Sequence, residues 1–151
     1  PASVPPEGGS GGSAPTFAIW AVKDPEGANL DRLQVIKGWV DASGASHETI
    51  FDVALSDDRR AGPDGKVPAV GSTVDVASAS YSNSIGASQL RAFWQDPEFD
   101  SGQEAFYYAR ALEIPTPRWS TYDAARLGVD APEPTGIQER AISSAIWYRG
   151  E

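Results

Sequence analysis

The chain has 151 residues, a formal net charge of −9 at pH 7, and neither cysteine nor methionine. This length corresponds to one ordinary domain, and the excess of carboxylates argues against nucleic acids and anionic membranes as partners, because both need clustered Lys and Arg. The absence of cysteine excludes disulfides and thiol chemistry. Because the chain starts at Pro1 instead of Met, we expect a fragment or a processed chain; loss of a signal peptide, and with it a periplasmic or secreted location, is one version of this expectation.

The first 14 residues are rich in Gly, Pro and Ser. This composition predicts a flexible linker, or an arm that lies on a neighbouring domain. Order should begin at Pro15, so we expect residues 15–151 to form the domain.

Short runs of aromatic, β-branched and alternating residues predict about seven strands, over residues 16–22, 33–41, 47–54, 73–77, 89–94, 106–114 and 140–148. Residues 42–46 form a Gly-containing turn that joins the second run to the third as a hairpin. Residues 121–128 predict one short helix, with Ser120 or Thr121 as its cap and Gly128 as its stop. The pattern therefore indicates a mostly β chain, an antiparallel, immunoglobulin-like β-sandwich of about seven strands with one short helix.

The run over residues 106–114 is the strongest strand signal. Its period of two divides the side chains between two faces. One face carries Phe106, Tyr108, Arg110 and Leu112, and the other carries Tyr107, Ala109 and Ala111.

A run of oxygen-bearing side chains follows the first predicted strand. Asp24, Glu26, Asn29 and Asp31 could converge around a sharp turn at Gly27, and hard cations such as Ca²⁺ take several such oxygens. The spacing differs from that of an EF-hand loop. Two interpretations stay open here, an ordinary turn connection and a Ca²⁺ site.

Arg118 and Trp119 follow a stiff Pro115-Thr-Pro117 segment at the end of the strongest strand. A stiff backbone can present an Arg to an anion and a Trp to an apolar partner. The alternative is that Trp119 fills the edge of the sandwich and Arg118 pairs locally.

No catalytic constellation is visible in the sequence. His47 is the only histidine and has no Cys or second His as a partner for a metal. Ser143 and Ser144 do not stand in a Gly-x-Ser-x-Gly motif, so a Ser-His-Asp triad is not indicated. The Asp57-Asp-Arg-Arg60 run predicts a solvated loop with local charge pairing.

Three long segments resemble one bacterial family. They are residues 24–39 (DPEGANLDRLQVIKGW), 106–119 (FYYARALEIPTPRW) and 137–148 (IQERAISSAIWY), and residues 73–77 agree as well. The chain is similar over residues 15–148 to the end of domain of unknown function 3604 (DUF3604). Family members look like larger proteins related to PHP-type metal-dependent hydrolases, whose His and Asp metal ligands precede this region. The family often has Thr-Ser-Pro where this chain has Ser143-Ser-Ala145.

The resemblance implies a C-terminal accessory β domain that packs on a metal-dependent hydrolase domain of the same protein. The resemblance does not identify the substrate. It places the divalent metal in the upstream catalytic domain. We therefore expect that this chain is not catalytic alone and holds no cofactor beyond the Ca²⁺ considered above. The alternatives are a free-standing secreted module that binds a carbohydrate or a protein, and a purely structural domain. Exposed aromatic residues would favour the carbohydrate module, because sugar rings stack on Trp and Tyr.

Overall fold

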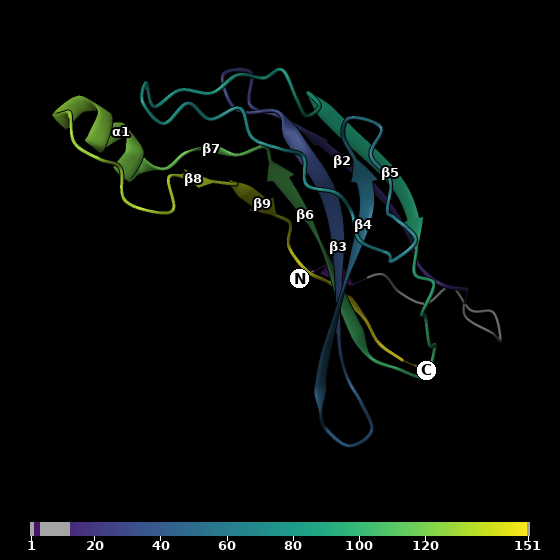
Figure 1. The fold of residues 1–151 in the computed structure, drawn as a ribbon. Coiled ribbons are helices and arrows are strands. Elements are labelled where there is room, and N and C mark those ends of the chain that lie inside the picture. The colour runs from purple at the N-terminus through teal and green to yellow at the C-terminus, as the bar shows by residue number, and fades with distance from the viewer. Residues whose placement is uncertain (1, 4–12, 151) are drawn as a thin grey trace.

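The computed structural model describes residues 2–3 and 13–150, and it is mostly β with antiparallel sheets and one helix (Figure 1). This confirms the predicted fold class. The arm predicted at residues 1–14 lies largely outside the described residues. The helix is too short to cross a membrane, and the described residues contain no other helix long and apolar enough to do so.

The first layer is a six-stranded sheet. Its order is β1 (Ala2–Ser3), β10 (Ile146–Tyr148), β6 (Ala105–Glu113), β3 (Leu30–Val40) and β4 (Ser46–Leu55), and β9 (Arg140–Ile142) also pairs with β6. All of these pairs are antiparallel except β1 with β10, which are parallel. The long β3–β4 hairpin protrudes from one end of the molecule (Figure 1).

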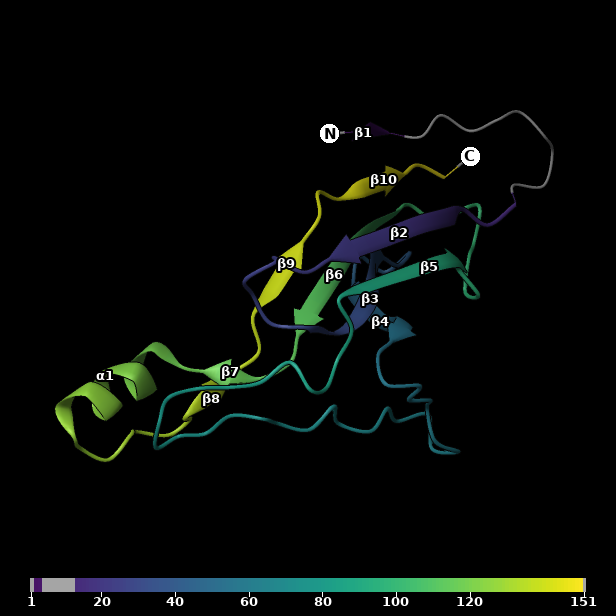
Figure 2. The same ribbon diagram turned by 90° about the horizontal axis from the view of Figure 1, so that it is seen from above.

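The second layer has two strands, β2 (Thr16–Val22) and β5 (Gln89–Gln95), which cross one face of the large sheet (Figure 2). Their inward residues pack on β3 and β6. Phe17 lies 5.0 Å from the Tyr107 ring, and Ile19 packs against both buried clusters of the core. The layers form a sandwich in which one sheet is much smaller than the other.

β3 is largely buried: it has a hydrogen-bonded neighbour on each side in the sheet, and the second layer covers one of its faces. Leu33 and Val35 face the second layer, and Ile36, which follows Val35, is also fully buried. The β6 faces follow the predicted division. Tyr107 points into the core, whereas Phe106 and Tyr108 stack on one another on the opposite face, with ring centroids 6.5 Å apart.

The last predicted strand is divided into β9 and β10. Ser143 lies at the break, where its N–H donates to the carbonyl of Ala109 and its hydroxyl accepts the N–H of Ala109, at 2.9 and 3.0 Å. A side-chain oxygen thus takes the place of a backbone carbonyl, so the regular ladder is interrupted while both halves still pair with β6.

The strand predicted over residues 73–77 is wrong. The segment is irregular apart from one bridge between Asp75 and Ser80. The carboxylate of Asp75 accepts the N–H groups of Ala77 and Ser78, which closes a local turn instead of a ladder.

β7 (Thr116–Pro117), α1 (Trp119–Leu127) and β8 (Gly136–Ile137) form an arm that projects from the sheet (Figure 1). Gly128 ends the helix in a left-handed conformation, with φ 65°, as predicted. The predicted cap is wrong, because the helix is preceded by Arg118 without a side-chain cap. Ser120 and Thr121 already lie inside the helix, which begins at Trp119, and the Thr121 hydroxyl donates to the Thr135 carbonyl just before β8.

Candidate functional site

Asp31, a predicted calcium ligand, lies buried where the arm meets the large sheet. Its carboxylate accepts hydrogen bonds from Arg59, from Arg32 Nε at 3.1 Å and from Gln138 Nε2 at 2.9 Å. Arg59 Nη2 also donates to the Asp31 carbonyl at 2.7 Å. Arg59 also donates to the Ser56 and Pro68 carbonyls of its own loop, at 3.1 and 2.9 Å, but its ion pair is with the distant Asp31, contrary to the local charge pairing expected from the sequence. The sequence contains no signal for this cluster around Asp31, because one of its members, Gln138, lies 107 residues away from Asp31.

The loop that follows β2 is closed around the ammonium group of Lys23. Its Nζ donates to the carbonyl oxygens of Asp24, Pro25 and Gly27, at 2.8, 2.9 and 3.0 Å. The carboxylate of Asp24 accepts the N–H of Glu26 at 2.9 Å. The oxygens of this loop thus hold a cation that belongs to the chain itself.

Asn29, the remaining predicted ligand, points to another segment. Its Nδ2 donates to the carbonyls of Asn83 and Ile85, at 3.2 and 2.8 Å. The structure therefore does not bring the four predicted ligand side chains together, and within residues 2–3 and 13–150 no three His, Cys, Asp or Glu side chains are placed to hold a metal ion. The Ca²⁺ site stays a prediction, which a rise of the Tm with millimolar Ca²⁺ would support.

A buried ion pair links β3 to the end of β5. Lys37 Nζ lies 2.6 Å from Asp96 Oδ2, which also accepts the Tyr107 hydroxyl at 2.7 Å. Burial works to raise the pKa of Asp96, but Lys37, Tyr107 and the Glu98 N–H outweigh it and hold that pKa below its usual value. Burial, and then Asp96, raise the pKa of Tyr107. The side chains of Lys37 and Asp96 are only 2% and 0% exposed, so the pair fixes the fold and cannot reach a substrate.

His47 lies at the exposed β3–β4 hairpin, where its ring stacks on Trp39 and its Nε2 lies 2.6 Å from Asp41 Oδ2. The Ser43 hydroxyl donates to the other oxygen of Asp41. The Ser43 hydroxyl, then His47 and the Ala45 N–H, lower the pKa of Asp41. Because the carboxylate stands between the serine and the histidine, the trio is not arranged for nucleophilic catalysis, which requires a serine–histidine bond.

Arg118 and Trp119 lie at the start of α1, on the projecting arm. The Trp119 side chain does not fill the sandwich edge, since the residue is 69% exposed. Arg118 binds the arm through its backbone, with its N–H on the Thr135 carbonyl at 3.0 Å. The five ion pairs of the described residues do not include Arg118, so its guanidinium is not locally paired there.

Other large apolar side chains on the arm share this exposure. They are Tyr122, Leu127, Val129 and Ile137, with 40%, 75%, 61% and 40% exposed. The arm is nevertheless firmly attached. Ile114 at its root is fully buried, and Gln138 Nε2 binds both Asp31 and the Glu113 carbonyl. We call the outward side chains of Trp119, Tyr122, Leu127, Val129 and Ile137, with Arg118, the arm surface.

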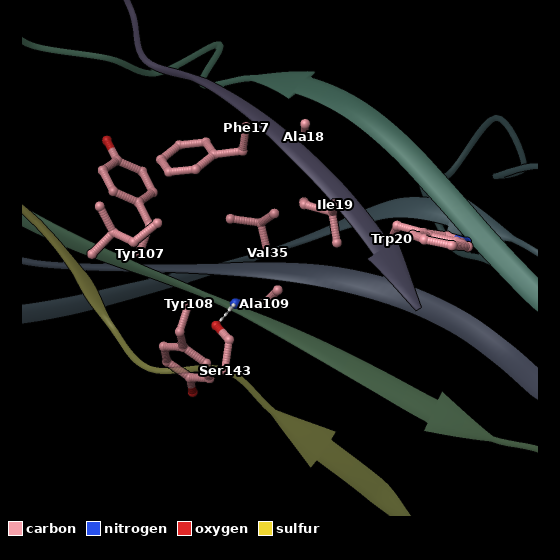
Figure 3. A pocket seen from close by; sticks show the side chains of 10 residues that line it. Phe17, Ala18, Ile19, Trp20, Val35, Tyr107, Tyr108, Ala109 and Ser143 are labelled. Atoms are coloured by element: carbon pink, nitrogen blue, oxygen red, sulfur yellow. Dashed lines mark hydrogen bonds between the residues drawn. The ribbon is translucent and has the colours of Figure 1, made fainter. Parts of the chain in front are cut away.

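A small hollow of about 280 Å³ opens between β2 and β6 (Figure 3). Its lining is mostly apolar, and its residues are Phe17, Ala18, Ile19, Trp20, Val35, Tyr107, Tyr108, Ala109, Ser143 and Ile146. In the described part of the chain β2 pairs only with β5, so the hollow lies beside an open strand edge. The Ser143 hydroxyl in its lining is already bonded to Ala109. The described residues that line it include no His, Cys, Asp, Glu, Lys or Arg, so the hollow offers mainly packing space.

A family model described as "Protein of unknown function (DUF3604)" matches residues 6–150. No curated protein and no solved structure matches the chain. The family match covers almost the whole chain and confirms the resemblance seen in the sequence.

Proposed function

Since the chain belongs to the DUF3604 family, we propose that it is the C-terminal accessory domain of a metal-dependent hydrolase and that the arm surface docks it on the catalytic domain. The hydrolase relationship rests on the family resemblance described above. The sequence itself has one His and no Cys, and therefore lacks the imidazole and thiolate ligands that Zn²⁺ and similar metals favour.

The exposure of Trp119 is the observation that carries the docking proposal. A Trp exposes a large apolar surface to water, and here it is grouped with four more exposed apolar side chains on one projecting element. Exposed apolar surface often marks an interaction site, so five such side chains on one arm favour this role. Trp and Arg are also the residue types that most often dominate the energy of protein interfaces.

The attachment of the arm supports the same proposal. Its root is fixed by the buried Asp31 cluster, and the Thr121–Thr135 hydrogen bond of 2.6 Å holds α1 within the arm, which favours one orientation of the surface before a partner arrives. A surface organised in advance loses less conformational entropy when it binds. Arg118 would then pair with a carboxylate of the catalytic domain or with an anionic group of its substrate.

The test is the Arg118→Ala substitution in the protein that carries both domains. We expect lower turnover together with an unchanged fold of this domain, because the substitution removes a side chain that makes no ion pair within the described residues. The matched control is Arg60→Ala, at an exposed arginine in a loop outside the arm. Turnover equal to that of the wild type in Arg118→Ala would remove the role proposed for Arg118.

A further inference from the structure

The end of the large sheet opposite the arm carries a groove of about 810 Å³. One row of paired residues runs across four strands at this place: Glu48 pairs with Gly38, Gly38 with Phe106, and Phe106 with Trp147. Directly paired residues point to the same face of a sheet. The row therefore brings a carboxylate and two aromatic rings to one surface, with no side chain at Gly38 between them.

The aromatic floor of the groove is held in place. A Cβ at Gly38 would lie 2.3 Å from the Phe106 ring, so glycine is the residue that allows the ring to lie across β3. Phe106 in turn contacts Trp147, with ring centroids 5.2 Å apart and the ring planes at 47°. Trp147 is half exposed. An exposed indole supported from below by a second ring is a rigid stacking platform.

Polar side chains surround this platform. Ser46 in β4, Glu104 just before β6 and Arg149 just after β10 stand two residues from Glu48, Phe106 and Trp147, and all of them line the groove. Side chains two apart in a strand share a face. The ion pairs of the described residues use other side chains, so the carboxylates of Glu48 and Glu104 and the guanidinium of Arg149 keep their hydrogen-bonding capacity.

We propose that this groove binds a short neutral oligosaccharide, with a sugar ring stacked on Trp147 and its hydroxyls bound by Glu48, Glu104 and Arg149. The apolar C–H face of a pyranose fits an aromatic ring, and its hydroxyls donate to carboxylates and accept from a guanidinium. The volume lies within the range of small-ligand sites, roughly 300–1,000 Å³.

Other ligand classes fit the groove less well. The two carboxylates and the net charge of −9 repel phosphates and other anions. The guanidinium of Arg149 beside the platform offsets one of the two carboxylates, so the groove attracts an organic cation less than the carboxylates alone would. The groove is separate from the arm surface, so this inference does not depend on the docking function.

The test titrates the whole chain with neutral trisaccharides built from glucose, galactose, mannose and N-acetylglucosamine, followed by calorimetry. We expect at least one of them to bind, and Trp147→Ala to weaken that binding by at least about tenfold. Trp20→Ala should leave it unchanged, because Trp20 is 70% exposed on β2, outside the groove.

Glu48→Gln and Trp147→Phe keep the test decisive if Trp147→Ala does not fold. The first should weaken binding without changing the circular dichroism spectrum, and the second should retain part of the affinity. Three results would overturn the proposal: no binding by any trisaccharide up to about 10 mM, binding that Trp147→Ala leaves unchanged, or preferential binding of choline.

Discussion

Charged and aromatic side chains are buried and paired in the centre of the sandwich, whereas on the projecting arm they are more exposed and less paired. In the centre, charged side chains are buried and paired, as in Lys37 with Asp96, and aromatic rings pack on one another. On the arm, Trp119 is 69% exposed and Arg118 lies outside the ion pairs of the described residues. The contrast teaches that the charged and aromatic side chains of the sandwich find their partners within the chain. The arm instead presents a guanidinium and apolar side chains that a partner protein could bind.

The largest effect is expected when the buried ion pair in the centre of the sandwich is broken. Lys37→Ala should lower the free energy of unfolding by about 3–5 kcal/mol, because the carboxylate of Asp96 would stay buried without its cation. Urea denaturation measures the change. Lys66→Ala, at an exposed lysine in a loop, serves as the control and should change stability by less than about 0.5 kcal/mol. A loss below about 1 kcal/mol in Lys37→Ala would show that the pair is not a main support of the core.

The second prediction concerns the pH dependence of stability that the Lys37–Asp96 pair produces. Because the pKa of Asp96 is lowered in the folded state, its contribution is present above the unfolded-state pKa, near 3.8, and is lost as the pH falls through the folded-state value. The free energy of unfolding should therefore fall below about pH 4, with a slope of up to ~1.4 kcal/mol per pH unit from this group. Asp96→Asn should flatten the profile in that range, and an unchanged profile would show that other carboxylates carry the acid sensitivity.

The smallest expected effect lies on the arm. Trp119→Ala should change the free energy of unfolding of the chain by less than about 0.5 kcal/mol, since most of the side chain already contacts water. Ile114→Ala at the buried root of the same arm should cost about 2–5 kcal/mol. Thermal and urea unfolding of the two variants compare them directly. Equal losses would mean that Trp119 packs on the chain itself.

The strands were predictable from the sequence wherever the pattern was local. The run over residues 16–22 matches β2, and the period of two in residues 106–114 assigned the faces of β6 correctly. The residues 73–77 show where this fails, because a short β-branched run was overridden by the turn that Asp75 closes. The break at Ser143 also depends on a partner strand that one sequence does not reveal.

The candidate site was predictable only in part. The Pro-x-Pro segment before Arg118 and Trp119 coincides with the base of the arm, where β7 leads into α1, while its predicted stiffness stays a prediction. The role of Asp31 could not be predicted, since its partners Arg59 and Gln138 lie 28 and 107 residues away. The groove at Trp147 depends on pairing across four strands, and strand order was not available from composition or periodicity.

The most direct test of the docking proposal is the accessibility of the arm surface in the protein that carries both domains. The chain contains no cysteine, so Leu127→Cys on α1 and Ala42→Cys in the β3–β4 turn, at the other end of the molecule, give two clean labelling sites (Figure 1). In the isolated chain both should react rapidly with a maleimide. In the two-domain protein, with any other cysteines replaced, Leu127→Cys should react at least about tenfold more slowly while Ala42→Cys keeps its rate. Equal rates at Leu127→Cys in the two proteins would contradict docking through the arm.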